Sequence, residues 1–443
     1  MSRRPLVALL VAEVVSAVGT RMAALALPWF VLATTGSATK TGIVAFAELL
    51  PYVLASALGG PWIDRLDARR VSVVADILSA GFVVAVPLLH ERIGYAGVVA
   101  LVAVVGTFRG FGDTSKRAMF PRVVRTSGMD LTRGASLQDG LARLATLLGA
   151  PAGGLLIAAF DAPTVLVVDA ATFVVSGLVV ALAVPVTRAA AARREPYLRA
   201  LRAGAAFLTR DHLVAGLILM VFCTNLLDAA YTSVLAPLWA TEHGTSTLLG
   251  VLFATFGIGA VLGNVVFTAV APRAPRFALY ALGFLVGGAP RFAALALADV
   301  WVIVVVSFTA GLAMAAINPI LGAVMYERIP EGMMARVQGL TTAVAWAGMP
   351  LGALVGGWLA GSAGLRWTLL VLGAVYLLVT LAPLTHPMWR RLDERPAPPD
   401  EPVPPAGRPA PADGRPAAAG ASAVPRPRER HRPAAPNVDG RRR

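Results

Sequence analysis

RGASLQDGLARLATLLGAPAGG, residues 133–154, and RVQGLTTAVAWAGMPLGALVGG, residues 336–357, share one layout 203 positions apart in the chain. In each stretch an arginine is followed 20 residues later by a glycine pair, Gly153-Gly154 in the first and Gly356-Gly357 in the second. Each pair lies inside a long apolar run, and each half of the chain holds six such runs. The repeat indicates a duplicated membrane unit of six helices, an architecture found mainly in secondary transporters.

The composition is that of a membrane protein. Of the 443 residues, 57% are hydrophobic and only 14% are charged, whereas soluble proteins carry roughly 25% charged residues. Because a helix needs about 20 mostly apolar residues to cross a bilayer, we predict an all-α integral membrane protein with twelve transmembrane helices in two pseudo-symmetric halves. The predicted spans are 6–33, 41–63, 71–89, 95–119, 135–159, 163–185, 213–239, 247–270, 277–297, 300–325, 336–360 and 365–386.

These spans divide the chain into an N-terminal half, 1–185, and a C-terminal half, 213–386. An arginine-rich cytoplasmic loop, 186–212, joins the two halves and is either a hydrated linker or a basic segment at the lipid surface. Residues 387–443 contain 14 Pro and have no apolar periodicity, so we predict a disordered cytoplasmic tail.

The net charge of +14 is distributed as in a membrane protein rather than a nucleic-acid-binding protein. The loops on one side of the predicted membrane hold 20 Lys and Arg residues, and those on the other side hold only Lys40, Arg92 and Arg366. Cytoplasmic loops carry such an excess of basic residues. We therefore predict a multi-pass protein of the cell membrane with both termini in the cytoplasm, in contact with lipid and not with nucleic acid.

Several chemistries lack the residues they require. Cys223 is the only cysteine, so an internal disulfide and a thiolate metal site are excluded. The chain has only two lysines, Lys40 and Lys116, and no glycine-rich loop that ends in lysine, so ATP-driven transport by this chain alone is excluded. No Ser/His/Asp set or metal cluster is recognisable. We predict a protein without a cofactor, metal or enzymatic activity, and a monomer.

The loop after the second predicted span, GGPWIDRLDARR from Gly59 to Arg70, resembles the signature G-x-x-x-D-R-x-G-R-R of the major facilitator superfamily. Asp67 stands where the signature has glycine, and the final basic pair comes one position late. Both departures resemble the efflux branch that includes macrolide and enterobactin exporters. The resemblance implies a cytoplasmic gate of paired charges, which we assign to Asp64, Arg65, Arg69, Arg70 and Asp76.

Three more stretches resemble that branch: SAVGTRMAALALPWF at 16–30, FPRVV at 120–124 and VDAATF at 168–173. Exporters of the superfamily often have G-P-x-x-G-G in helix 5, and here Pro151 is displaced by one position. Proline and small residues still favour a kinked, closely packed helix. The residues predicted to act in helix packing are Gly149, Pro151, Gly153, Gly154, Gly356 and Gly357.

Charged residues inside a bilayer are costly, and they mark functional sites or paired structural groups. Asp228 lies near the middle of predicted span 7 with Asn225 one turn before it, and Glu13 and Ser16 repeat this spacing in span 1 beside Arg21. In the superfamily these helices line the central cavity. We therefore predict that the stripes bind substrate or protons, against the alternative that Asp228 only hydrogen-bonds a neighbouring helix.

A second group of charges lies in the hairpin of spans 4 and 5. Folding the hairpin about residue 126 puts Arg109 level with Arg143 and Asp113 level with Asp139. The predicted role is a structural or gating charge network. Glu48, Asp169 and Arg291 are also predicted to lie inside the membrane, without a role that the sequence assigns.

The leading hypothesis is a proton-driven exporter of a hydrophobic or amphiphilic small molecule, such as a drug, antibiotic, siderophore or other secondary metabolite. The two halves would rock around a central cavity. An importer or uniporter of the same fold is the alternative within transport, because direction does not follow from fold. A membrane sensor or scaffold that does not transport is the alternative outside it.

Overall fold

The computed structural model describes residues 3–59, 62–63, 66–129, 131–185, 206–243, 246–271, 273–329 and 334–394, and every regular element within these ranges is a helix. The elements of the first half are α1 (Arg4–Thr35), α2 (Ala38–Leu58), α4 (Ala68–Thr126), α5 (Leu131–Ala159) and α6 (Ala162–Ala183). Those of the second half are α8 (His212–Ala230), η1 (Tyr231–Leu235), α9 (Ala236–Glu242), α10 (Ser246–Val270), α11 (Arg276–Gly287), α12 (Ala289–Leu297), α13 (Val300–Met314), α14 (Ile317–Arg328), α15 (Met334–Ala363), α16 (Leu365–Thr385) and η3 (Pro387–Leu392).

The described residues contain eleven continuous helical segments long and apolar enough to cross a membrane. One of them, α4, has 59 residues, about 88 Å at 1.5 Å per residue, whereas the hydrocarbon core of a bilayer is about 30 Å thick. Gly94 interrupts α4 with φ 64°, a conformation that glycine adopts without steric cost. Two crossings therefore meet at Gly94, and the segments supply the twelve crossings that the sequence predicted.

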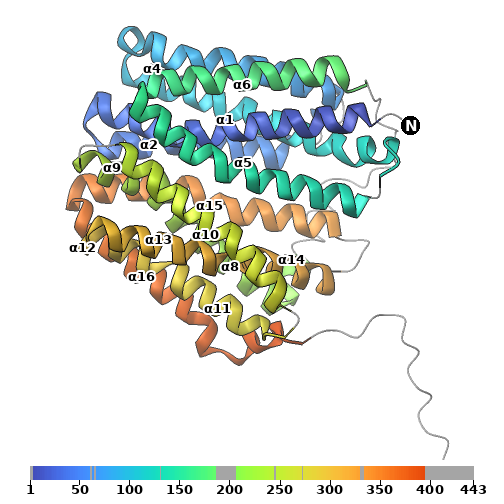
Figure 1. The fold of residues 1–443 in the computed structure, drawn as a ribbon, viewed down its shortest axis with the longest axis vertical. Coiled ribbons are helices and arrows are strands. Elements are labelled where there is room, and N and C mark those ends of the chain that lie inside the picture. Colours follow the sequence, from blue (N-terminus) through green and yellow to red (C-terminus); the bar gives the residue numbers. More distant parts are fainter. Residues whose placement is uncertain are drawn as a thin grey trace, which may run out of the picture. The chain divides into compact units, whose positions relative to one another are not determined.

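Each half packs mainly against itself, and two helix pairs make most of the contacts between the halves, beside smaller contacts of α1 with η1 and α9 and of α2 with η1. In the first half α1 contacts α5 and α6, while α4 contacts α2 and α6. In the second half α10 contacts α13, α8 contacts α15, and α12 contacts α16. Across the halves α2 packs on α15 and α5 packs on α10 (Figure 1). The sequence repeat relates α2 to α10 and α5 to α15, so the two joining pairs are counterparts of each other.

The repeated glycine pairs lie at these joints, and the two members of each pair have different partners. A Cβ at Gly153 would lie 2.9 Å from Met22 Cα of α1, inside the first half, whereas Gly154 faces Gly250 of α10. Likewise Gly356 faces Ala230 of α8, inside the second half, whereas Gly357 faces Gly42 of α2. One glycine of each pair therefore allows close packing within a half, and the next allows close packing between halves.

Both contacts between glycines lie toward one end of the bundle, which we call the distal end. It holds the α1–α2 connection at Gly36, the α5–α6 connection at Phe160 and the α15–α16 connection at Gly364. Thr39 strengthens this end, because its hydroxyl donates to Gly357 O at 3.2 Å. The opposite end, which includes Arg3, is called the proximal end. The distal end is thus closed by direct backbone contact between the halves.

The outer surface of the helices is apolar, as expected for lipid contact. Large hydrophobic side chains are exposed along the described helices, among them Leu182 at 85% and Trp301 at 81%. Exposed apolar surface on this scale is unusual for a soluble monomer and marks contact with a membrane or partner. Together with helix length, it supports the predicted multi-pass membrane protein.

The tail begins later than the sequence predicted. We expected disorder from residue 387, but Pro387–Leu392 forms the short 3₁₀ helix η3. Trp389 and Leu392 are buried, and the Trp389 ring stacks against Tyr280 of α11. Both side chains and the partly buried Met388 pack against the core. Asp393 accepts from the Phe277 backbone N–H at 3.0 Å, so the segment is fixed on the second half. Residues 395–443 and most of the predicted loop 186–212 lie outside the described residues.

Candidate functional site

Asp228 of α8 forms an ion pair with Arg291 of α12, 2.5 Å from Oδ1 to Nη2. The Arg291 side chain is only 6% exposed and that of Asp228 is 26% exposed. The guanidinium also lies over the rings of Tyr231 and Phe256, 5.2 and 5.4 Å from their centroids. Asp228 therefore has a structural partner in its own half that the sequence did not identify, because Arg291 lies 63 positions away.

We expect Asp228→Asn to reduce the yield of folded protein, because Arg291 would lose its counter-charge. The loss should be smaller than the roughly 3–5 kcal/mol typical of buried pairs, since Asp228 is partly exposed and solvent screens it. The measurement is the amount of monodisperse protein after detergent extraction, and Asp228→Asn/Arg291→Gln should regain most of it. Full yield of Asp228→Asn with lost transport would instead favour the direct role that the sequence predicted.

The other polar residues of the two predicted stripes differ in what they contact. Asn225 donates to Ala345 O of α15 at 2.9 Å, so its amide fixes a helix contact. Ser16 is buried in α1. Thr232 Oγ1 donates to the carbonyl oxygen of Asp228 at 2.8 Å, as threonines of the other helices do with the residue four positions earlier. The π-helix η1 begins three residues after Asp228. Such π segments occur frequently at functional sites.

Glu13 of α1 has a neutral partner. Both of its carboxylate oxygens accept from Gln138 Nε2 of α5, at 2.9 and 2.7 Å. Arg21, two turns further along α1, is exposed, and Gly149 of α5 packs against it. Glu13 is half-buried and engaged by an amide alone in these contacts, so its carboxylate can gain or lose a proton without breaking an ion pair.

A cluster of aromatic and charged side chains lies where the two halves face each other. The sequence predicted functional roles for its members Glu13 and Asp113, but not for Tyr52, Arg117 and Trp346. Tyr52 of α2 donates to Asp113 of α4 at 3.1 Å. Its ring stacks on Trp346 of α15, 6.1 Å between centroids. Arg117 of α4 lies 5.6 Å from the centroid of the same indole. Glu13 interacts electrostatically with Asp113 and Arg117. We call Glu13, Tyr52, Asp113, Arg117 and Trp346 the facing cluster.

The predicted diagonal network of spans 4 and 5 does not describe the contacts of Arg109. Arg109 forms an ion pair with Glu48 of α2, and Asp113 accepts from Tyr52. The physical reason is that α4 packs on α2 and α6 and makes little contact with α5. The side chains of Asp139 and Arg143 lie outside the described residues, so their part in a network stays a prediction.

Asp76 is held in the interior of the first half. Its Oδ1 accepts from Lys116 Nζ at 3.0 Å and its Oδ2 accepts from Ser176 Oγ at 2.8 Å. The side chains of Asp76 and Lys116 are 3% and 2% exposed. The sequence placed Asp76 beside the gate arginines, but both of its oxygens are occupied by these two residues. Lys116 lies near the end of the predicted span 95–119, and the sequence did not identify it as the partner of Asp76.

The loop that resembles the family signature is partly described. Asp67 has φ 71°, a conformation that glycine favours, and it stands at the glycine position of the signature. Its Oδ1 accepts from the Arg69 backbone N–H at 3.3 Å, which caps α4 and offsets part of the strain. The Arg69 guanidinium donates to Ala181 O of α6, and Arg70 is exposed. Asp64 and Arg65 lie outside the described residues, so the gate stays a prediction.

The second half fixes its proximal end with ion pairs. Arg276 donates through both terminal nitrogens to Glu327, at 2.7 and 2.8 Å. Arg328 lies 3.3 Å from Asp211. The second-half counterpart of the signature loop, residues 263–276, contains no Asp or Glu. Its Arg276 pairs with Glu327 of α14 instead. Such bidentate pairs are geometrically specific.

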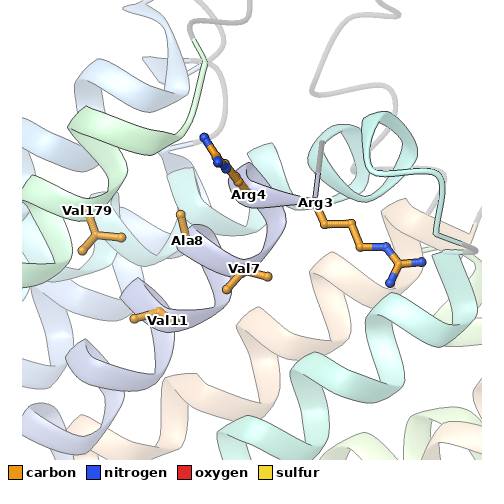
Figure 2. Close-up of a pocket in the computed structure, with 6 residues that line it drawn as sticks. All are labelled: Arg3, Arg4, Val7, Ala8, Val11 and Val179. Carbon is orange, nitrogen blue, oxygen red and sulfur yellow. The ribbon is translucent and has the colours of Figure 1, made fainter. Parts of the chain in front are cut away.

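Figure 2 shows a shallow groove at the proximal end, about 540 Å³ in volume, formed by α1 and α6. Arg3 and Arg4 lie at its rim, and the apolar residues Val7, Ala8, Val11 and Val179 line it. It contains none of the intramembrane charges and lies away from the facing cluster. Within the described ranges, no three His, Cys, Asp or Glu side chains are grouped to hold a metal ion.

Comparison with known families and proteins agrees with this architecture. The model of the Major Facilitator Superfamily matches residues 9–229 and again residues 217–433. The structure of the nucleoside transporter NupG superposes with a TM-score of 0.70 over 86% of this chain and 98% of that one, at 15% sequence identity. The fold predicted from the sequence is confirmed.

The curated relatives are efflux proteins. The multidrug efflux pump Tap of Mycobacterium tuberculosis is 30% identical over 91% of this chain and 98% of its own length. The enterobactin exporter EntS of Escherichia coli is 27% identical over 79% of this chain and 83% of its own length. Macrolide efflux protein A of Streptococcus pyogenes is 20% identical over 86% of this chain and 95% of its own length. The predicted resemblance to the efflux branch is confirmed.

Proposed function

Because this chain belongs to the Major Facilitator Superfamily, we propose that it exports hydrophobic or amphiphilic small molecules in exchange for protons. The observation that carries the proposal is the facing cluster, where half-buried carboxylates and aromatic rings from both halves meet inside the membrane. The similarity to efflux proteins along most of the chain supports export as the direction of transport. The substrate class is that of drugs, antibiotics and siderophores.

The facing cluster suits an amphiphilic ligand, preferably a cation. The rings of Tyr52 and Trp346 offer flat apolar surface, and a cation above an aromatic face gains about 0.5–2 kcal/mol. In the structure Arg117 lies over one face of Trp346. Displacement of Arg117 by a substrate cation would leave the carboxylates of Asp113 and Glu13 as its counter-charges. Such a site recognises charge and apolar area rather than one molecular outline, which fits a broad substrate range.

Glu13 is the carboxylate that we assign to proton exchange within this site. The partner of its carboxylate is the amide of Gln138, whereas Asp228 is paired with Arg291 and Asp76 with Lys116. Proton binding at Glu13 would neutralise the anion that attracts a cationic substrate. Protons entering from outside would therefore displace substrate, and loss of the proton toward the cytoplasm would restore the site.

Alternating access would come from rocking of the two halves at the pairs α2·α15 and α5·α10. The excess of basic residues in the loops of the proximal end assigns that end, with both termini, to the cytoplasm. The distal end is then the outer gate. The closed contacts at Gly42–Gly357 and Gly154–Gly250 correspond to a conformation sealed from the outside.

The test uses everted membrane vesicles that contain the full chain and hold an inward-acid pH gradient. We expect amphiphilic drugs, macrolides or siderophores to collapse the gradient. Trp346→Ala should require a roughly tenfold higher compound concentration because a ring of the site is lost. Trp358→Ala on the same helix, 60% exposed toward lipid, is the matched control and should behave like wild type. Compound uptake without proton movement would overturn the antiport, and equal responses of both variants would overturn the site.

A further inference from the structure

Three ionisable side chains meet inside the first half, away from the facing cluster. Glu48 of α2, Arg109 of α4 and Asp169 of α6 line one small cavity of about 20 Å³, enclosed by α1, α2, α4 and α6. The rest of its lining is aliphatic, including Leu27 and Val105. Arg109 is bound to Glu48. The structure thus holds two carboxyl groups and one guanidinium in an apolar surrounding.

The cluster has one negative charge too many if both carboxyl groups are ionised. Glu48 has the cation as its direct partner. Asp169 is 1% exposed, and its Oδ1 is buried without a hydrogen-bond partner. A buried carboxylate with an unpartnered oxygen is unfavourable in an apolar site, and such a group takes up a proton instead. One proton makes the cluster neutral.

We infer that Asp169 is a proton-binding site of the first half: in the conformation closed at the distal end, Asp169 is a neutral acid while Arg109 neutralises Glu48. None of the sequence motifs described above assigns a ligand to these three residues. The site differs from Glu13, which belongs to the facing cluster, and from the Asp228–Arg291 pair in the second half.

The charged groups on the elements around Asp169 do not supply another partner for its Oδ1. On α1, Gly19 packs against Asp169, while Glu13 is engaged by Gln138 and Arg21 is exposed. On α4, Asp113 accepts from Tyr52 and Lys116 is bound to Asp76. Asp76 also accepts from Ser176, which lies two turns of α6 beyond Asp169. Within the described part of the chain, Arg109 is therefore the cation that Glu48 and Asp169 share.

This arrangement gives the proton a way to leave. If Arg109 moves from Glu48 to Asp169, the Asp169 O–H bond breaks and the proton passes to Glu48, so the three groups stay neutral. Passage of the proton from Glu48 to a water then leaves the three groups with one negative charge. The cavity of about 20 Å³ has room for a single water. Because α2 contacts the second half, movement between the halves would shift Glu48 relative to Arg109. This coupling step rests on the proposed antiport, whereas protonation of Asp169 does not.

Infrared difference spectroscopy of the full-length protein in lipid tests protonation without a substrate. At neutral pH, wild type minus Asp169→Asn should show the carbonyl stretch of a carboxylic acid, shifted in D₂O. Glu48→Gln should remove the same band although Asp169 is present, because Arg109 is then free to pair with Asp169. The inference would be overturned if the spectrum of wild type minus Asp169→Asn showed only carboxylate bands and no acid band. It would also be overturned if the acid band were still present in Glu48→Gln.

Asp161 is the matched control, because it is an aspartate at the start of the same helix. Its side chain accepts from the Thr164 backbone N–H at 2.7 Å, which lowers the pKa of Asp161 below its usual value. Asp161 is therefore ionised at neutral pH, and Asp161→Asn should remove carboxylate bands and leave the acid band unchanged. Asparagine caps a helix as well as aspartate does, so the fold is retained.

A transport experiment tests separately whether protonation of Asp169 is coupled to substrate movement. In proteoliposomes, Asp169→Asn should lose substrate-driven proton movement while exchange of labelled substrate across the membrane stays within about twofold of wild type. Loss of both activities would assign Asp169 to structure and overturn its coupling role. Wild-type protein that moves substrate without protons would overturn the proposed antiport alone, because the acid band is measured independently.

Discussion

Asp76→Asn should remove most of the folded protein from the membrane rather than slow its turnover. Asparagine has the same volume and fits the close packing of Gly112 and Gly177 around this side chain. It lacks the charge, however, and Lys116 at 2% exposure would be left without a counter-ion. Removing one member of a buried pair costs roughly 3–5 kcal/mol, a large part of the typical stability of a protein. Size-exclusion profiles and thermal unfolding of the solubilised protein measure the effect.

Two comparisons make this result specific. Asp113→Asn alters an aspartate of the same helix that is half-buried and accepts one hydrogen bond from Tyr52, so we expect a small change in the unfolding midpoint. Asp76→Asn/Lys116→Gln removes both charges and should recover much of the lost protein, because the penalty comes from the unpaired ammonium. If Asp76→Asn had normal yield and a normal unfolding midpoint but slower transport, the result would support the gate role that the sequence predicted for Asp76.

The sequence was sufficient for the helices and their duplication because these depend on local properties. Length and hydropathy set each crossing, and the repeat of Arg133 and Gly153-Gly154 in the second half related the halves. The glycine pairs also identified close packing. What they did not reveal was that Gly153 and Gly154 have partners in different halves, since adjacent residues on a helix point about 100° apart.

The partners of the buried charges could not be read from the sequence, because they depend on which helices are neighbours. A hairpin drawn from spans 4 and 5 paired Arg109 with residues of span 5. In the structure α4 packs between α2 and α6, so its charges meet Glu48, Ser176 and Asp169 instead. For the same reason the sequence did not identify Arg291 as the partner of Asp228 or Lys116 as the partner of Asp76. A cation inside a membrane usually has a partner such as an anion or a backbone carbonyl, but the sequence does not show which group it is.

Gly357→Val should abolish transport while leaving most of the protein folded. A Cβ at this position would lie 2.7 Å from Ala38 O and 2.8 Å from Gly42 Cα, closer than real Cβ atoms come to backbone. Since backbone atoms of α2 cannot move aside singly, α2 and α15 must separate at the distal end. A transporter that cannot close this end cannot complete alternating access. We expect the transport rate to fall at least about tenfold, because a free-energy cost of about 1.4 kcal/mol for closing the distal end lowers the population of the closed state tenfold.

The neighbouring glycine is the sharpest control for this variant. Gly356 packs on Ala230 of α8 within the second half, so Gly356→Val should lower the yield of folded protein. Gly339→Val on α15, where a Cβ meets nothing within 4 Å, should alter neither yield nor transport. Gly154→Val, the counterpart of Gly357→Val in the repeat, should reproduce its loss of transport because it faces Gly250.

Accessibility at the distal end shows whether the halves have separated. In a Cys223→Ala background, Thr39→Cys introduces a single thiol beside Gly357 and Gly361, at the contact of α2 with α15. A membrane-impermeant maleimide added from the distal side should label this thiol slowly in the parent and faster when Gly357→Val is also present. Because the valine acts only by its volume, Gly357→Ala should give an intermediate rate. Wild-type transport by Gly357→Val would mean that the distal contact is not part of the transport cycle, and the closed end would then have a structural role alone.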